Sequence, residues 1–230
     1  RAHRLVTLAG PGGGGKTRLA LEVAHRLSGE FTDGVWLFEL AAVSDPGAVP
    51  DAVAAVFGIT RQPGMSVADS VAKALEGRKR LLLFDNCEHV LDAAGDLIEA
   101  ILAQSTTVTI LATSREGLAV ADEQRWAVSP LDIAAGADSA AVELFLGRAH
   151  AVAQRFSLSD PAQGAAVIDI CRQLDGIPLA IELAASRMAS MTPVEVRDRL
   201  SQRFRLLVGS GRAHARHQTL RHAVGWSYDH

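Results

Sequence analysis

The sequence predicts an α/β fold with a parallel, doubly wound sheet, followed by a smaller helical part. Three observations lead to this prediction. Up to Pro130, short apolar stretches alternate with segments of helical periodicity, which is typical of strand–helix–strand units. The runs RLLLFD (80–85) and TVTILATS (107–114) are continuously apolar, as expected for strands buried on both faces. A glycine-rich segment, GPGGGGKT (10–17), directly follows the first apolar stretch.

Each element has its own local signal. Turn residues precede the second strand, Gly58 closes the second helix, and Ser66 with Asp69 forms a plausible capping pair for the third. The predicted strands are 4–9, 35–40, 80–85, 107–114 and 125–129. The predicted helices are 16–28, 48–57, 66–75 and 90–103.

After Pro130 the pattern becomes helical. Helices are predicted over 138–154, 162–174, 178–189 and 193–201, and two of them begin with a capping residue followed by proline, Asp160-Pro161 and Thr192-Pro193. Gly209-Ser210-Gly211 is a predicted hinge, and 216–227 a further helix. We therefore expect a first, α/β domain over 1–136, a helical subdomain over 137–205, and a linker with the start of a third subdomain over 206–230.

Composition excludes several classes of protein. The chain has 230 residues, 48% of them hydrophobic, and a formal net charge of −3, so no overall charge favours nucleic acid or membranes. No apolar run is long enough to span a bilayer and no signal peptide is apparent, so we expect a cytoplasmic protein. Two cysteines do not suggest a disulfide framework. Because the first residue is Arg1, we expect a piece of a longer protein.

The segment GPGGGGKT satisfies the phosphate-binding pattern G-x-x-x-x-G-K-[ST] through Gly10, Gly15, Lys16 and Thr17. Successive backbone N–H groups and a helix N-terminus favour an anion, the lysine reaches the β- and γ-phosphates, and the hydroxyl holds Mg²⁺. The preceding strand and following helix are the context that such a loop requires. The alternative is a glycine-rich turn with an incidental lysine.

A second candidate lies in LLLFDNCEH (81–89). Asp85 ends a buried strand, where ligands of parallel sheets bind, and an acid there holds Mg²⁺ in P-loop proteins. The alternative is an acidic turn residue. Many hydrolytic P-loop proteins carry a second acid next, but this chain has Asn86, which cannot act as a base. Glu88 could reach the site instead. Weak hydrolysis is therefore expected.

Two further candidates are less specific. Arg115, in ATSR (112–115), could bind the γ-phosphate through charge-assisted hydrogen bonds, or could pair with Glu116 or solvent at the surface. Pro178, in GIPLA (176–180), could pack against a nucleotide base or simply be the first residue of its helix.

Taken in order, these motifs resemble a known family. The segments are GPGGGGKTRLA, LLLFDNCEHVLD, TILATSREGL, CRQLDGIPLAIELAASR and FRLL…RHQTLRHAVGWSYD. They are similar to the NB-ARC-type domain of STAND signalling ATPases, in particular to those of actinobacterial transcriptional regulators. The resemblance implies a P-loop NTPase with strand order 5-1-4-3-2, a helical ARC1-type subdomain that closes over the nucleotide, and a winged-helix subdomain. It also implies an ATP/ADP switch, often with nucleotide-dependent oligomers.

The resemblance assigns roles to individual residues. Arg115 matches a sensor arginine and Pro178 a proline near the adenine. Catalytic roles are expected for Lys16, Asp85 and Arg115, and Mg²⁺ binding for Thr17 and Asp85. The residues expected to bind ATP or ADP are Gly10, Gly12, Gly13, Gly14, Gly15, Lys16, Thr17, Arg18 and Pro178.

The chain departs from the family pattern at three points. Gly14 stands where a bulkier residue is usual. The segment that normally precedes the first strand is missing, and the winged-helix part stops before its ADP-sensing histidine. The first departure is expected to soften the loop, and the other two to weaken nucleotide affinity.

The most consistent interpretation is an ATP/ADP-binding switch with slow ATPase activity in a signalling or transcriptional regulator. DNA contact is expected only through a domain outside this chain. The alternative is a non-hydrolysing module in which the nucleotide is structural, and Asn86 favours it. A metabolic kinase is disfavoured because the helical part lacks an acceptor-site constellation. A guanine-specific protein is disfavoured because no lysine follows Lys79 to complete an N-K-x-D-type motif.

Overall fold

The structure, a computed structural model, describes residues 3–153 and 160–207, with side chains described up to residue 200. Contacts divide the chain into two compact units, one formed by the residues up to Gly10 with Lys16–Val128, the other by Pro11–Gly15 with the chain from Ser129 onward. The predicted hinge at 209–211 and the predicted helix over 216–227 lie outside the described residues. The predicted domain boundary near residue 137 stays a prediction.

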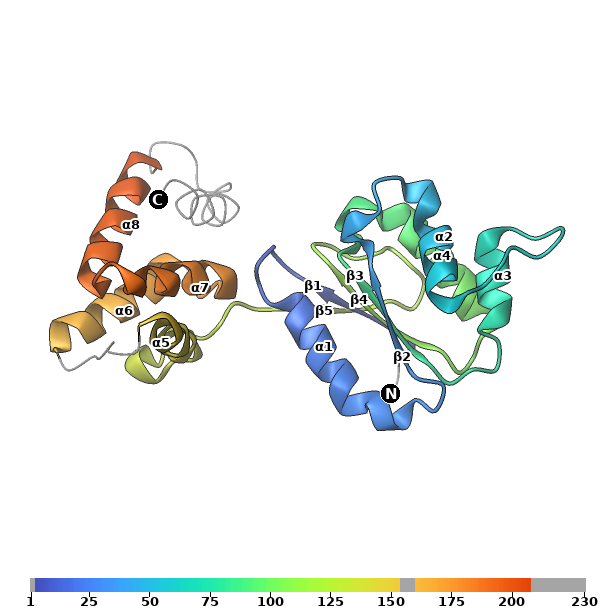
Figure 1. Ribbon diagram of the computed structural model, residues 1–230, viewed down its shortest axis with the longest axis horizontal. Helices are drawn as coiled ribbons and strands as arrows, with labels where there is room; N and C mark the ends of the chain where they lie inside the picture. Colours follow the sequence, from blue (N-terminus) through green and yellow to red (C-terminus); the bar gives the residue numbers. More distant parts are fainter. Residues whose placement is uncertain (1–2, 154–159, 208–230) are drawn as a thin grey trace. The chain divides into compact units, whose positions relative to one another are not determined.

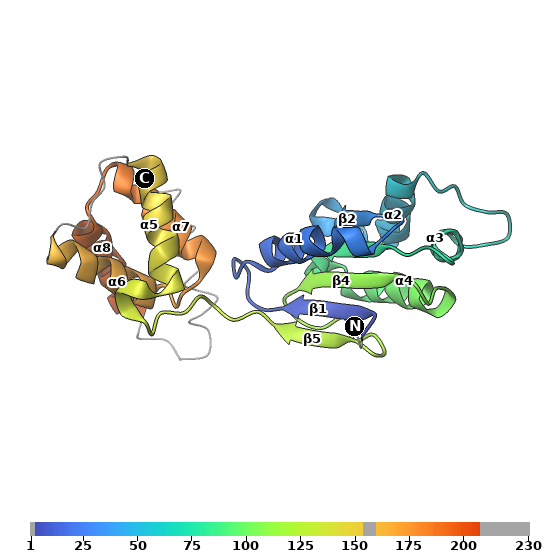
Figure 2. The same ribbon diagram turned by 90° about the horizontal axis from the view of Figure 1, so that it is seen from below.

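The first unit is built on a five-stranded sheet in the order β2-β3-β4-β1-β5 (Figure 1). Every neighbouring pair is parallel. The strands are β1 (Leu5–Ala9), β2 (Val35–Glu39), β3 (Leu81–Asp85), β4 (Thr109–Ser114) and β5 (Gln124–Ala127). Read from β5, this order is the predicted 5-1-4-3-2, so the fold class is confirmed. Figure 2 shows β4, β1 and β5 side by side.

Helices cover both faces of this sheet. On one face, Leu81, Leu83 and Leu8 pack with Ala20 and Ala24 of α1 (Lys16–Leu27). On the other face, the alternate residues of the same strands join a larger core with α2 (Val49–Phe57), α3 (Val67–Ala74) and α4 (Leu91–Gln104). Figure 1 shows α1 on one side of the strands and α2 to α4 on the other. Since both faces are buried, the continuous apolar runs at β3 and β4 are explained.

Local signals set the helix ends as predicted. Ser66 and Asp69 form a capping box at the start of α3, each side chain bonding the other's backbone N–H. Gly58 ends α2 with φ +65°, and its N–H bonds the last carbonyl groups of that helix. The bounds of the other first-unit elements agree with the predicted ones to within two residues at either end.

The described part of the second unit contains the α-helices α5 (Ala140–Val152), α6 (Pro161–Gln173), α7 (Pro178–Ser186) and α8 (Pro193–Leu207). The Asp160 carboxylate accepts from Ala162 N, and the Thr192 hydroxyl accepts from Glu195 N, so both predicted caps are present. Helix α8 runs beyond the predicted end at residue 201 because no glycine or proline occurs before Gly209 to stop it. The core of this unit is apolar, with Phe145, Ile170 and Ile181 fully buried.

Gly176 is required by its surroundings. Its φ of +68° favours glycine, and a Cβ atom there would lie 2.3 Å from the carbonyl oxygen of Leu131. The Leu131 N–H also donates to the Gly176 carbonyl, at 2.9 Å. The glycine therefore helps to end the preceding helix and also admits a neighbouring backbone segment.

Among the residues that the structure describes, no helix combines the length and apolar character needed to traverse a bilayer.

Candidate nucleotide-binding site

The glycine loop joins β1 to α1, as the sequence predicts. Gly13 and Gly15 have φ values of +74° and +89°, which L-residues with side chains rarely adopt. The Gly14 N–H donates to the Pro11 carbonyl at 3.3 Å, and the Gly10 N–H donates to the Ser114 carbonyl, also at 3.3 Å. The loop therefore turns tightly at two glycines, as a backbone cradle for an anion requires.

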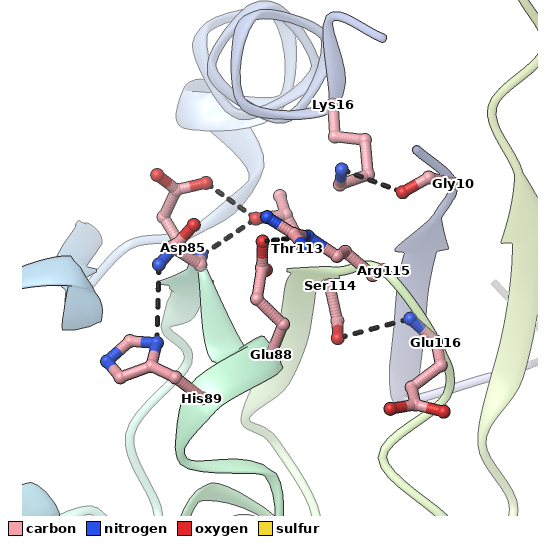
Figure 3. Close-up of polar contacts among 10 residues, drawn as sticks. Gly10, Lys16, Asp85, Glu88, His89, Thr113, Ser114, Arg115 and Glu116 are labelled. Atoms are coloured by element: carbon pink, nitrogen blue, oxygen red, sulfur yellow. Dashed lines mark hydrogen bonds and ion pairs between the residues drawn. The ribbon is translucent and has the colours of Figure 1, made fainter. Parts of the chain in front are cut away.

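Lys16 is the first residue of α1 and is only 8% exposed. Its ammonium donates to the Gly10 carbonyl at 2.9 Å (Figure 3). Burial lowers the pKa of Lys16, and the charge of Arg115 lowers it further, whereas the charges of Glu88 and, less strongly, Asp85 raise it. The ammonium thus lies in a partly desolvated position where an added anion would be stabilising.

Asp85 lies at the end of β3 and is held by two hydroxyl groups. Thr17 Oγ1 donates to Asp85 Oδ1 at 2.7 Å, and Thr113 Oγ1 donates to the same oxygen at 2.6 Å. Thr113, at the end of β4, also accepts a hydrogen bond of 2.9 Å from the Asn86 N–H. The predicted pair of Thr17 and Asp85 is therefore brought together from two segments that are far apart in the chain.

The donor chemistry at Asp85 suits Mg²⁺. Carboxylate and hydroxyl oxygens are hard ligands, and Mg²⁺ is commonly held by one or two protein oxygens together with phosphate and water. Within residues 3–153 and 160–200, no three His, Cys, Asp or Glu side chains are grouped to hold a metal ion. A cation at this position would therefore take its other ligands from phosphate and water.

Asn86 follows Asp85 and carries an amide in place of a second acid, and this amide contacts His89. Its backbone is left-handed, with φ +65°, and its amide nitrogen lies 3.3 Å from His89 Nδ1. His89 Nε2 lies 3.0 and 3.1 Å from the carbonyl oxygens of Leu40 and Val43, which can only accept, so Nε2 carries the hydrogen. In the neutral ring Nδ1 is then the acceptor for the Asn86 amide.

Arg115 directly follows β4 and forms an ion pair with Glu88. Its Nε donates to Glu88 Oε1 at 3.1 Å, with side chains 58% and 17% exposed, respectively. The alternative partner considered above, Glu116, instead donates its backbone N–H to Ser114 Oγ. Figure 3 shows the Glu88 and Arg115 side chains directed toward one another at the strand ends.

The remaining predicted residues lie elsewhere. Arg18 is exposed on α1. Pro178 is the first residue of α7 in the second unit, as expected if it only starts that helix. Their roles toward a nucleotide stay predictions. Thr113 and His89 were not singled out from the sequence, although a threonine near the end of an apolar strand is a signal for the first.

Comparison with known proteins supports the predicted resemblance. A Mycobacterium tuberculosis protein described as an HTH-type transcriptional regulator is 45% identical over 227 residues, which is 98% of this chain. The regulatory protein AfsR of Streptomyces coelicolor is 29% identical over 201 residues, 83% of this chain. The chain spans 25% and 18% of these two proteins. No protein-family model matches.

Solved structures share the fold at low sequence identity. The ORC2 protein of Aeropyrum pernix, solved as ADPNP–ADP complexes, has a TM-score of 0.53 at 15% identity, covering 86% of this chain and 60% of its own. A STAND protein from Pyrococcus horikoshii has a TM-score of 0.50 at 12% identity, covering 87% of this chain and 30% of its own. The predicted resemblance to a domain of bacterial transcriptional regulators is confirmed by these relatives, and the chain shares its fold with a STAND protein.

Proposed function

We propose that this chain is an ATP- and ADP-binding switch domain with slow ATPase activity, acting within a longer transcriptional regulator. The single observation that carries the proposal is the meeting of Thr17 and Asp85, whose oxygens lie 2.7 Å apart beside the buried Lys16. A loop hydroxyl and a strand-end carboxylate in contact form the Mg²⁺-binding pair of a P-loop site. A glycine turn with an incidental lysine would have no reason to contain this pair.

The residues have distinct roles in this proposal. Lys16 and the backbone N–H groups of residues 12–17 bind the phosphates, because an ammonium and a helix N-terminus both favour anions. Thr17 and Asp85 would hold Mg²⁺, and the ion would supply neutralisation of the phosphate charge. Arg115 contacts the γ-phosphate, and Thr113 keeps the Asp85 carboxylate oriented through its hydrogen bond.

Adenine nucleotides are the proposed ligands. The A. pernix ORC2 structure contains ADPNP and ADP, and the fold is shared with a STAND protein. Because the matching regulators are several times longer than this chain, a DNA-binding segment would lie elsewhere in the polypeptide. A packing role for Pro178 at the adenine and a lid role for the helical part belong to the same proposal.

Nucleotide binding is tested by extraction and by a matched substitution. Purified protein is denatured, and the released nucleotide is identified by chromatography. Binding of a fluorescent ADP analogue is then measured for wild type, Lys16→Ala and Lys73→Ala. Lys73 is the control because it is an exposed lysine on α3 of the same unit. We expect Lys16→Ala to weaken binding at least about 100-fold, as the loss of a partly buried charge contact implies, and Lys73→Ala to leave it unchanged. Equal affinities in all three proteins would overturn the proposal.

A second candidate function is a non-hydrolysing module in which bound ADP or ATP is structural. The observation that favours it is Asn86, whose amide contacts His89 and supplies no base. Single-turnover assays with protein in excess of ATP separate the two functions. Phosphate release that Lys16→Ala abolishes supports the ATPase. Tight ATP binding without release over hours supports the structural module.

A further inference from the structure

This chain has Asn86 where many P-loop hydrolases have a second acid, but another acid, Glu88, lies two residues further along the chain. The left-handed backbone of Asn86, with φ +65° and ψ +52°, turns the chain into a 3₁₀ turn, Cys87–His89. Cys87 is fully buried and His89 bonds two backbone carbonyl groups, so the turn is anchored on both sides of its central residue. That central residue is Glu88. The turn therefore holds the Glu88 carboxylate at the strand ends, although Glu88 does not directly follow Asp85 in the sequence.

The two oxygens of Glu88 have different environments. Oε1 accepts a hydrogen bond from Arg115 Nε at 3.1 Å. Oε2 is buried and has no hydrogen-bond partner among the described residues. A buried carboxylate oxygen without a partner is costly, and such atoms in native proteins call for an explanation such as a catalytic role or a bound water. Glu88 thus has one oxygen bonded to Arg115 and one whose hydrogen-bonding capacity is unused among the described residues.

Glu88 also lies close to the residues proposed to bind phosphate. Among the acids that act on Lys16, its charge has the larger effect and that of Asp85 the smaller. The pairing with Arg115 engages only one of the donors in the guanidinium fork, so that the same arginine has others to offer a phosphate oxygen. Figure 3 shows the Glu88 side chain among Arg115, Thr113 and Ser114 rather than directed to the exterior of the turn.

A purely structural role for the Glu88–Arg115 ion pair explains fewer of these observations. The arginine is 58% exposed, and exposed ion pairs contribute little to stability. Such a pair would give no reason to bury the second oxygen of Glu88 without a partner. An acid that holds a water molecule next to a bound phosphate accounts for both oxygens.

We propose that Glu88 is the carboxylate that orients and deprotonates the water attacking the γ-phosphate, in place of the acid that Asn86 lacks. The inference rests on the proposed ATPase function. In the step, the water oxygen forms a bond to the γ-phosphorus while the bond to the β–γ bridging oxygen breaks and its electron pair leaves with ADP. The proton that water loses passes to Glu88 Oε2 and from there to solvent. Arg115 holds Oε1 and so fixes the direction of Oε2.

The test compares Glu88→Gln with Glu116→Gln. Glutamine keeps the shape of the side chain but is not a base, and Glu116 is an exposed acid at the same strand end. We expect Glu88→Gln to reduce single-turnover hydrolysis by on the order of 100-fold or more. Its affinity for a non-hydrolysable ATP analogue should stay equal or become up to about tenfold tighter, because one negative charge beside the phosphates is removed. Glu116→Gln should change neither quantity.

The outcomes separate the two proposals. A structural role for Glu88 would instead lower the melting temperature and the analogue affinity together, which would overturn the inference. Wild-type hydrolysis that Glu88→Gln retains in full would overturn the inference and leave the ATPase proposal standing. A wild-type protein that binds ATP without hydrolysing it would overturn the inference and the ATPase part of the proposal. A wild-type protein that binds no nucleotide would overturn both proposals entirely.

Discussion

The two units of the chain bury polar groups very differently. Among the described side chains, six of the seven buried polar or charged residues belong to the first unit, and only Ser139 belongs to the second. Ser139 is accounted for as the N-cap of α5. In the first unit, Lys16, Thr113 and Ser114 gather at the carboxyl ends of the strands. Buried polar groups are costly unless bonded, so these three residues at the strand ends mark the part of the first unit where a functional constraint is expected.

Equivalent core deletions in the two units are expected to have the largest effects. Phe84 of β3 and Phe145 of α5 are both fully buried, and replacing either with alanine should lower the free energy of unfolding by about 3–5 kcal/mol. Only Phe84→Ala should also weaken ADP binding in the folded protein, because Phe84 precedes Asp85 on the same strand. Urea unfolding and ADP titration measure the two quantities. Equal loss of ADP affinity in both variants would contradict a central role in the site for Lys16, Thr17 and Asp85, which belong to the first unit.

Buried hydroxyl groups provide a finer comparison. Thr113→Val removes the donor to Asp85 and leaves the Asn86 N–H without its acceptor, so unfolding should become easier by about 1–3 kcal/mol. Ser139→Ala removes only a helix cap, which should cost about 1 kcal/mol. Thr113→Ser, which keeps the hydroxyl, should bind ADP with the same dependence on Mg²⁺ as the wild type. If Thr113→Val binds ADP and Mg²⁺ as wild type does, Thr113 is not needed to orient Asp85.

The two cysteines report on the units separately, since Cys87 lies in the first and Cys171 in the second. Burial raises the pKa of each thiol from 9.0 to about 12, and at Cys87 the charges of Asp85 and Glu88 add to it. Both thiols should therefore resist alkylation by iodoacetamide at pH 8 in the folded protein and react in urea. Mass spectrometry along a urea series should show which unit opens first. Rapid labelling of either thiol without urea would contradict its burial.

The same pKa values predict a loss of stability in alkaline solution. A thiol whose pKa is higher in the folded state stabilises that state fully below pH 9, where both states are protonated. This contribution is lost as the pH rises from about 9 toward 12, because the unfolded chain ionises first. Replacing Cys171 with alanine should flatten this part of the pH dependence of unfolding.

Local signals in the sequence predicted the strands and the approach of Thr17 to Asp85, whereas the order of the sheet was implied by the family resemblance. Apolar runs identify buried strands, and the ends of parallel strands meet at one edge. The sequence did not predict the contact of Glu88 with Arg115, since this depends on the left-handed turn at Asn86, and asparagine permits but does not require that conformation. The role of His89 was likewise hidden, because its partners at residues 40 and 43 belong to another part of the chain.

The smallest expected effect concerns Gly14, where the chain has four consecutive glycines. Gly14 differs from its neighbours Gly13 and Gly15 because its φ is not positive, so the backbone there accepts an L side chain. A Cβ atom at Gly14 would lie 3.1 Å from the Pro11 carbonyl oxygen, which would have to move by a few tenths of an ångström. Gly14 is buried, and the other described atom near this Cβ is a Pro11 ring carbon at 4.0 Å, which is an ordinary van der Waals contact.

Gly14→Val should therefore tighten ADP binding modestly. A side chain reduces the conformational entropy that the loop loses on binding, by up to about 1 kcal/mol, which corresponds to roughly fivefold in affinity. The matched control is Gly15→Val, where φ is +89° and a side chain would be strained, so binding should weaken. Calorimetric titration of both variants with ADP measures the difference. Unchanged or weaker binding by Gly14→Val would mean that loop entropy does not limit affinity, or that the Pro11 carbonyl cannot give way. Gly14→Ala separates these two causes, because it makes the same Cβ contact with a smaller side chain. If the Pro11 carbonyl cannot move, alanine should weaken binding as much as valine does.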